Sequence, residues 1–287
     1  MNPHEQTVRN ALQTGDEISS LFDRIGSADA PRGRILAAYR DAREQLASDE
    51  ALQRRRVVTI ALNDLRDTVN RELNSLVVES LEMGAEQAAA QLRAYDVAVS
   101  KGDGEWARPF VDAALLSVGA LVTMQIAQIM GLLFAGTVSA SQVVGSGSRV
   151  GILNPAPVIT QARDAVAKAA AASYDAVIER STRDGGWMRQ AVAAIDDRTT
   201  DCCLRVSGQT VPLNGEFKLT GTPRFADMMD APPFHLHCRT ALALVRAEDA
   251  GDNVTRRMRE AALNELGSRQ RGDNGTRPRP VNAFGSE

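Results

Sequence analysis

The sequence predicts a mainly α-helical protein with a small α+β module towards its C-terminal end. Alanine is abundant from end to end, while aromatic residues make up only 4% of the chain. This mixture favours helices that pack through small side chains. Apolar residues recur at helical spacing through the first half of the chain. Short runs of β-forming residues, separated by turn residues, follow Gly185 and Gly186.

The N-terminal half is predicted to form an elongated helical region. A first helix is expected from Val8 to Ile25, and a second begins near Pro31, which suits a helical first turn. The segment from Asp49 to Val99 contains no proline, so we expect one long helix there, or two separated near Gly84. Its apolar residues keep a near-heptad stripe. The stripe consists of Val58, Leu62, Leu65, Val69, Leu73, Leu76 and Val77.

The most apolar part of the chain, Phe110 to Ala140, follows a break at 102–104. From Ala113 to Ala135 it carries no charged residue, which matches the length of a membrane span. Gln125 and Gln128 interrupt the run, and no cluster of Lys or Arg marks one flank. We therefore interpret the segment as a helix buried among neighbours, with a membrane span as the alternative.

A domain boundary is predicted where Gly145 to Ser148 form a flexible joint ahead of Pro155 and Pro157. The expected organisation is an N-terminal helical region at 1–147, a module at 155–250, and a terminal helix with a flexible arm at 251–287. The module begins with a helix from Val158 to Arg180.

The rest of the module is predicted to hold a short antiparallel sheet. Its strands lie near Trp187 to Ile195, Gln209 to Leu213 and Thr240 to Val245. The terminal helix is expected from Asp252 to Leu266, with Gly267 as its stop. The arm beyond it contains Arg269, Arg271, Arg277, Pro278, Arg279 and Pro280.

Charge excludes one class of function. The formal net charge is -3 and the pI is about 5.8, so no net positive field exists to hold nucleic acid without sequence preference. Any DNA contact must be local. The first residues lack the order of a signal peptide, so we expect the chain to stay in the cytoplasm or to be carried from there inside a particle.

The chemical signal is concentrated in one window. All three cysteines, Cys202, Cys203 and Cys238, lie there with two of the three histidines, His235 and His237. Thiolate and imidazole are the preferred zinc ligands, and two ligand groups some thirty residues apart are typical of structural zinc sites. We predict Cys203, His235 and Cys238 as ligands, with Cys202, His237 or water in the fourth position. The alternative is that the thiols are small buried hydrophobes and the histidines bond local carbonyls.

The order of residues around this cluster resembles the Mu F-like phage head morphogenesis family. The residues that carry the resemblance span about Val158 to Val245. They are Trp187, then Asp196, Asp197, Arg198 and Thr199, then Cys203 and Gly208, and later Pro232, Pro233, His235, Cys238 and Arg239. The chain departs from the family pattern at three positions: Thr200 and Thr240 stand where the family has cysteines, and Leu236 where it has proline.

The resemblance implies a structural minor capsid protein of a tailed bacteriophage. It would lie inside the head, bound to the portal protein and also to scaffold or major capsid protein, and would act in head assembly or genome delivery. It would be made in the host cytoplasm and kept in the virion, with no membrane in the assembled particle. The DDRT segment also has a structural reading, because Asp197 and Arg198 can fix the backbone while Thr199 caps the turn.

We predict no enzymatic activity. A nucleobase deaminase needs HxE followed by PCxxC, and neither part is present. No HExxH, GxSxG or glycine-rich phosphate loop occurs. Two alternatives remain. A zinc-dependent hydrolase could recruit Glu216 or the acidic residues of 227–230, and a membrane-active ejection protein could use Phe110 to Ala140.

Overall fold

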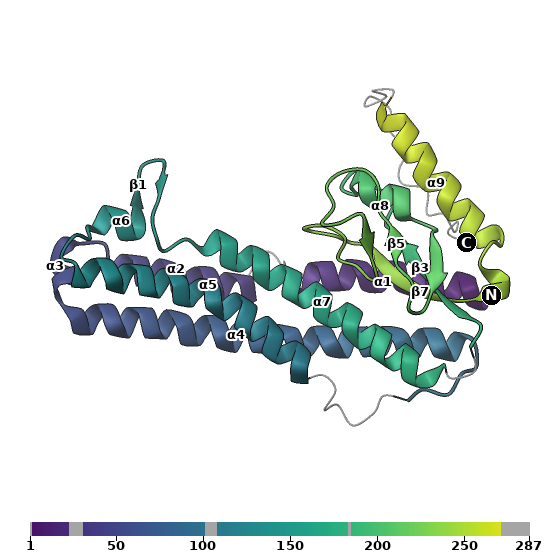
Figure 1. The fold of residues 1–287 in the computed structure, drawn as a ribbon, viewed down its shortest axis with the longest axis horizontal. Helices are drawn as coiled ribbons and strands as arrows, with labels where there is room; N and C mark the ends of the chain where they lie inside the picture. Colours follow the sequence, from purple (N-terminus) through teal and green to yellow (C-terminus); the bar gives the residue numbers. More distant parts are fainter. Residues whose placement is uncertain (1, 23–30, 101–107, 183–184, 271–287) are drawn as a thin grey trace. The chain divides into compact units, whose positions relative to one another are not determined.

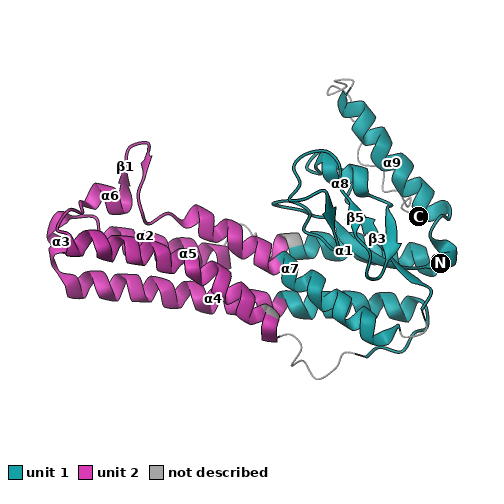
Figure 2. Cartoon of the chain, in the orientation of Figure 1, with its two compact units in different colours: residues 1–19, 80–106, 167–287 teal, residues 20–79, 107–166 magenta. Residues whose placement is uncertain are grey.

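The computed structural model describes residues 2–22, 31–100, 108–182 and 185–270 (Figure 1). The chain divides into two compact units, coloured separately in Figure 2: residues 1–19, 80–106 and 167–287 form unit 1, and residues 20–79 and 107–166 form unit 2. This division differs from the segments 1–147, 155–250 and 251–287 expected from the sequence. The reason is that two long helices, α4 (Arg55–Ala94) and α7 (Pro155–Ser181), each run through both units.

The predicted fold class is confirmed, since the described residues are mainly helical and their short antiparallel strands are concentrated in the second half of the chain. The remaining helices are α1 (Pro3–Phe22), α2 (Pro31–Gln45), α3 (Asp49–Gln53), α5 (Arg108–Phe134), α6 (Ala140–Val144), α8 (Asp201–Val206) and α9 (Asn253–Gln270). The strands are β1 (Gly145–Ser146), β2 (Arg149–Val150), β3 (Trp187–Val192), β4 (Thr210–Pro212), β5 (Phe217–Lys218), β6 (Met228–Met229) and β7 (Ala241–Arg246).

Unit 2 is organised around the apolar stripe of α4. Every member of the predicted stripe in this unit is buried, as are Ile35 and Tyr39 of α2. The predicted separation near Gly84 is wrong, because the chain breaks at Arg54 and α4 then continues for 40 residues. Ser48 caps the short helix before the break by accepting a hydrogen bond from the Ala51 backbone N–H.

Helix α5 is less buried than the sequence suggested. Val118, Val122 and Ile129 form a buried face, but Leu116 and Phe134 remain 73% and 67% exposed. Only 22% of its most apolar window is buried. By length and composition α5 could cross a membrane, and the expectation of a helix enclosed by neighbours is therefore wrong for its outer face.

The segment predicted as a flexible joint forms the hairpin of β1 and β2, in which Gly145 pairs with Val150. Gly145 has a φ of +83°, and a Cβ there would lie 2.4 Å from the Arg149 carbonyl oxygen. Glycine is needed at this position because both the backbone angle and the close approach exclude a side chain.

Unit 1 is built on the three-stranded antiparallel sheet β4-β3-β7, which matches the three predicted strands. Strand β7 is buried along nearly its whole length, because both of its faces are covered. Leu242 and Leu244 pack into a cluster with Leu92 of α4 and Tyr174 of α7. Ala241 and Ala243 pack into a second cluster, whose other members include Val8, Ala11, Val254 and Met258.

The outer edge of β7 is paired with side chains. Gln91 of α4 donates from Nε2 to the Leu242 carbonyl oxygen at 3.0 Å and accepts from the Leu244 backbone N–H at 2.7 Å. Its Oε1 also accepts from the Tyr174 hydroxyl at 2.8 Å. The amide of Gln91 thus takes the place of a neighbouring strand on a buried edge, where unpaired backbone groups would be costly.

Helix α9 extends further than predicted, through Gly267 to Gln270. Leu266 is buried with Leu204 and Ala262, and Arg269 bonds the Asp196 and Thr199 carbonyl oxygens, so packing and hydrogen bonds hold the last turn. The end of the first predicted helix at Ile25, the break at 102–104 and the arm beyond residue 270 lie outside the described residues.

We expect Gln91→Leu to lower the free energy of unfolding by about 2–4 kcal/mol, because the Leu244 N–H and the Tyr174 hydroxyl would both lose their buried acceptor. Urea denaturation measures the change. The control is Gln13→Leu on the exposed face of α1, which should change stability by less than about 0.5 kcal/mol. Equal effects of the two substitutions would contradict the edge-pairing role.

Candidate metal centre

Three of the predicted ligands meet in unit 1. Cys203 lies on α8, whereas His235 and Cys238 lie in the turn that leads into β7. The ligand atoms of the three residues all lie within 4.8 Å of one another. Thr200 positions the first of them, because it caps α8 by accepting from the Cys203 backbone N–H at 3.4 Å.

The spacing of the group suits a tetrahedral zinc ion. The Sγ atoms of Cys203 and Cys238 are 3.7 Å apart, and two thiolates bound to one zinc ion lie about 3.8 Å apart. The Cys203 Sγ is 2.9 Å from His235 Nε2, a contact that an ion would open to about 3.6 Å.

The imidazole of His235 is oriented by its own backbone. Its Nδ1 lies 2.6 Å from the Leu236 carbonyl oxygen, to which it donates. This bond places a proton on Nδ1 and turns Nε2 towards the thiols, which is how metal-binding histidines are commonly held. His235 is also buried, so its orientation does not depend on solvent.

The pKa shifts within the group are mutually consistent. The hydrogen bond to Cys238 and burial raise the pKa of the Cys203 thiol, and the Thr200 and Thr240 hydroxyls lower it by less. Cys238 is half-buried as a residue, but its sulfur is buried, which raises the pKa of the thiol. Hydrogen bonds from Cys203 and His235 outweigh burial and hold that pKa well below its usual range. Burial lowers the pKa of His235, and the Cys238 thiolate outweighs this and raises it.

A metal cation fits this donor set. Hydrogen bonds from Cys203 and His235 favour negative charge on Cys238 although burial opposes it, and a cation would favour that charge further. In their metal-binding forms the three residues would supply two thiolates and a neutral imidazole, which are ligands that zinc prefers. The Thr240 hydroxyl at the rim is buried and makes no hydrogen bond of good geometry with any described residue.

The two predicted alternatives for a fourth ligand do not join the group. Cys202 points from the same helix into the hydrophobic core with Val206 and Leu242. His237 is exposed and has a φ of 63°. The carboxylates of Glu216 and of 227–230 are also absent from the group of described residues that could hold an ion.

The DDRT turn is fixed by two arginines. Arg239 donates to the carboxylate of Asp196 and, at 3.0 Å, to the Thr199 hydroxyl. Arg269 donates to the Thr199 and Asp196 carbonyl oxygens at 2.6 and 2.7 Å. Since Arg239 follows Cys238 and the turn leads into α8, this clamp ties together the two segments that carry the ligands.

The sequence interpretation of this turn needs one correction. The carboxylate that bonds Arg239 is that of Asp196, whereas Asp197 is exposed and the side chain of Arg198 is 73% exposed. Thr199 closes the turn as predicted, donating to the Ala194 carbonyl oxygen at 2.5 Å. The role of Asp196 was not predicted, although this residue belongs to the DDRT segment. Thr200 and Thr240 stood out only as departures from the family pattern. Arg269 was expected in the extended arm, but it lies in the last turn of α9.

Trp187 and Gly208, two further residues of the family resemblance, have roles in packing and in the chain path. Trp187 is buried, meets Tyr95 edge-to-face at 5.1 Å between ring centroids, and carries the Arg246 guanidinium 3.6 Å from its ring centroid. Gly208 has a φ of +79° and donates its backbone N–H to the Ala191 carbonyl oxygen at 2.8 Å. It closes the connection between α8 and β4.

Comparison with known proteins identifies no relative: no protein-family model, no curated protein and no solved structure matches this chain.

The Asp196 clamp makes stability depend on pH. Burial raises the pKa of Asp196, but the hydrogen bond and charge of Arg239 outweigh burial, so the pKa lies below its ordinary value of 3.8. The carboxylate therefore stabilises the fold at pH values above 3.8, and this contribution is lost as the pH falls through the lowered pKa.

We expect Asp196→Asn to reduce the free energy of unfolding at pH 7 by about 1–3 kcal/mol, with a difference from wild type that shrinks as the pH falls below 3.8. Urea titrations over a pH series measure both effects. Asp197→Asn is the matched control, because this neighbouring carboxylate is exposed. A larger loss of unfolding free energy in Asp197→Asn than in Asp196→Asn would contradict the role of Asp196 in the clamp.

Proposed function

We propose that this chain is a structural minor capsid protein of a tailed bacteriophage, related to the Mu F-like head morphogenesis proteins. In this role it lies inside the head near the portal protein and acts in head assembly or genome delivery. Scaffold or major capsid protein are further partners, and contact with packaged DNA is local. It is made in the host cytoplasm and retained in the virion.

One observation carries the proposal. The residues of the resemblance come from two stretches about thirty residues apart, yet they meet in one place: Cys203 with His235 and Cys238, and Thr199 with Arg239. Residues that only happened to match a pattern would have no reason to converge. Their convergence supports a shared structural design in this part of the chain.

We further propose that the centre binds one structural zinc ion through Cys203, His235 and Cys238. When bound, zinc supplies a cross-link between α8 and the turn before β7. The Arg239 clamp holds the same two segments, so the ion would add stability to unit 1 without being the sole connection. Among the described residues the group contains two cysteines and a histidine, and no carboxylate that could act as a general base. This composition supports a structural role over hydrolysis.

The outer face of α5 favours a second candidate, a membrane-active ejection protein. The helix is uncharged from Ala113 to its end at Phe134, and its exposed large side chains include Leu116 and Met124. A helix of this length could span the hydrocarbon core. The two functions are compatible in a protein that leaves the head with the genome.

The particle itself tests the capsid proposal. We expect peptides of this chain, at low copy number relative to the major capsid protein, in both proheads and virions of the phage that encodes it, and co-sedimentation with the portal ring. Quantitative mass spectrometry of purified particles measures this. Absence from proheads and virions alike would overturn the proposal. Partition of the purified protein into liposomes would then favour the membrane-active candidate.

Elemental analysis tests the zinc proposal. We expect about one zinc ion per chain, and a loss of affinity of more than about 100-fold in Cys203→Ser and Cys238→Ser, because each removes a direct ligand. Cys202→Ala and His237→Asn are the controls, and asparagine tolerates the left-handed backbone of residue 237. A metal content near zero in the wild-type protein would favour packed thiols and a hydrogen-bonded imidazole.

A further inference from the structure

The described residues supply three ligands to the candidate centre, which leaves one position of a tetrahedral site. Cys203, His235 and Cys238 form the group, and no further His, Cys, Asp or Glu of the described residues belongs to it. Zinc prefers four ligands, and sites that keep an open position fill it with water or an exogenous molecule.

Two threonine hydroxyls lie at the rim of the group. The Thr200 Oγ1 is 2.8 Å from His235 Nε2. The Thr240 hydroxyl is buried near the Cys203 thiol, whose pKa it lowers, but it makes no hydrogen bond of good geometry among the described residues. The hydrogen-bonding capacity of the Thr240 hydroxyl is therefore not fully used, and this hydroxyl can bond a ligand held at the open position.

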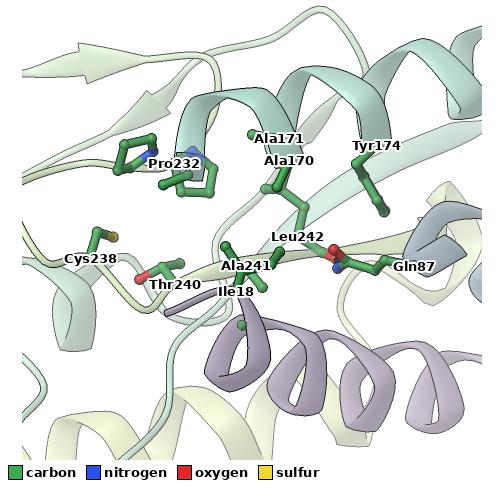
Figure 3. Close-up of a pocket in the computed structure, with 13 residues that line it drawn as sticks. Ile18, Gln87, Ala170, Ala171, Tyr174, Pro232, Cys238, Thr240, Ala241 and Leu242 are labelled. Carbon is green, nitrogen blue, oxygen red and sulfur yellow. Dashed lines mark hydrogen bonds between the residues drawn. The ribbon is translucent and has the colours of Figure 1, made fainter. Parts of the chain in front are cut away.

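A small cavity adjoins the same side of the centre. Cys238 and Thr240 both line it, together with Pro232 and Gly15, and Figure 3 shows Cys238 and Thr240 at the same end, away from Tyr174 and Gln87. Its volume is about 40 Å³. One water needs about 10–15 Å³ of such space, so the cavity has room for a few waters or one small ion.

We propose that a metal ion at Cys203, His235 and Cys238 keeps its fourth position for a small monodentate ligand, which enters through this cavity and bonds the Thr240 hydroxyl. Water fills the position by default, and small anions such as azide can replace it. The inference rests on the proposed metal binding. Because no carboxylate of the described residues belongs to the group, we assign the position a ligand and no reaction.

Cobalt(II) is the probe, because its visible spectrum reports the ligands around the ion. The metal-free protein is loaded with Co²⁺ and titrated with azide. We expect one Co²⁺ per chain, with thiolate charge-transfer bands, and a saturable change in the ligand-field bands as azide binds. In Thr240→Cys the new thiolate should fill the position, so azide should no longer change the spectrum.

Thr240→Val keeps the shape of the side chain and removes only the hydroxyl. It should retain the cobalt bands and weaken azide binding by about 2- to 12-fold, the effect of one lost hydrogen bond. Thr220→Val, at an exposed position of unit 1, is the control and should bind azide like the wild type. Equal azide affinity in Thr240→Val and wild type would overturn the role of the Thr240 hydroxyl.

The outcomes separate this inference from the one on which it rests. A wild-type protein that binds no Co²⁺ would overturn metal binding and the open position together. A protein that binds Co²⁺ with thiolate bands and does not respond to azide would keep the metal centre and overturn the open position. An unchanged azide response in a folded Thr240→Cys protein would show that the position lies elsewhere.

Discussion

The amide of Gln91 is the interaction on which the rest of unit 1 depends. Strand β7 is the last strand of its sheet, so one of its edges has no neighbouring strand. Its residues are buried along nearly the whole strand. Gln91 bonds the backbone at Leu242 and Leu244, and Gln87 adds a second bond to Leu242 at 2.8 Å. Helix α4 thereby fixes the strand whose first residue, Ala241, directly follows Cys238, Arg239 and Thr240. The position of the candidate centre is set by a helix more than a hundred residues earlier in the chain.

The close packing of α4 against α7 positions Gln91 and Tyr174 beside β7. A Cβ on Gly84 would lie 2.0 Å from the Ala170 carbonyl oxygen, so the backbones of α4 and α7 approach to a distance that only glycine allows. Ser173 strengthens this crossing by donating to the Leu81 carbonyl oxygen at 2.5 Å. Gly84 was read from the sequence as a point where the helix could stop. An isolated glycine in a long periodic helix can instead serve packing. Gly84 lets α7 approach α4 closely, which brings Tyr174 near Gln91.

Periodicity could predict the helices and the three strands of the main sheet, because these depend on residues that are near in sequence. The concentration of cysteine and histidine in one window could predict the group of Cys203, His235 and Cys238. Neither pattern could predict that α1 and α4 cover the sheet, since the pairing of Gln91 with β7 joins positions about 150 residues apart and a glutamine on a helix has no distinctive pattern. Asp196 and Asp197 are equivalent in sequence, and only the turn geometry decides which one meets Arg239. The outer face of α5 was misjudged because apolar composition predicts burial without showing which neighbours exist.

Two sets of side chains connect α8 and the turn before β7: the arginine clamp and the candidate metal centre. The clamp of Arg239, Asp196 and Thr199 is charge-assisted and complete within the described chain. The Cys203, His235 and Cys238 group is incomplete as a tetrahedral site, and the positions at which the resembling family has further cysteines hold Thr200 and Thr240 here. A module fastened only by metal would take its folding free energy from the ion. The arginine clamp closes this module without an ion, so a metal bound as proposed would add stability without being required for the fold.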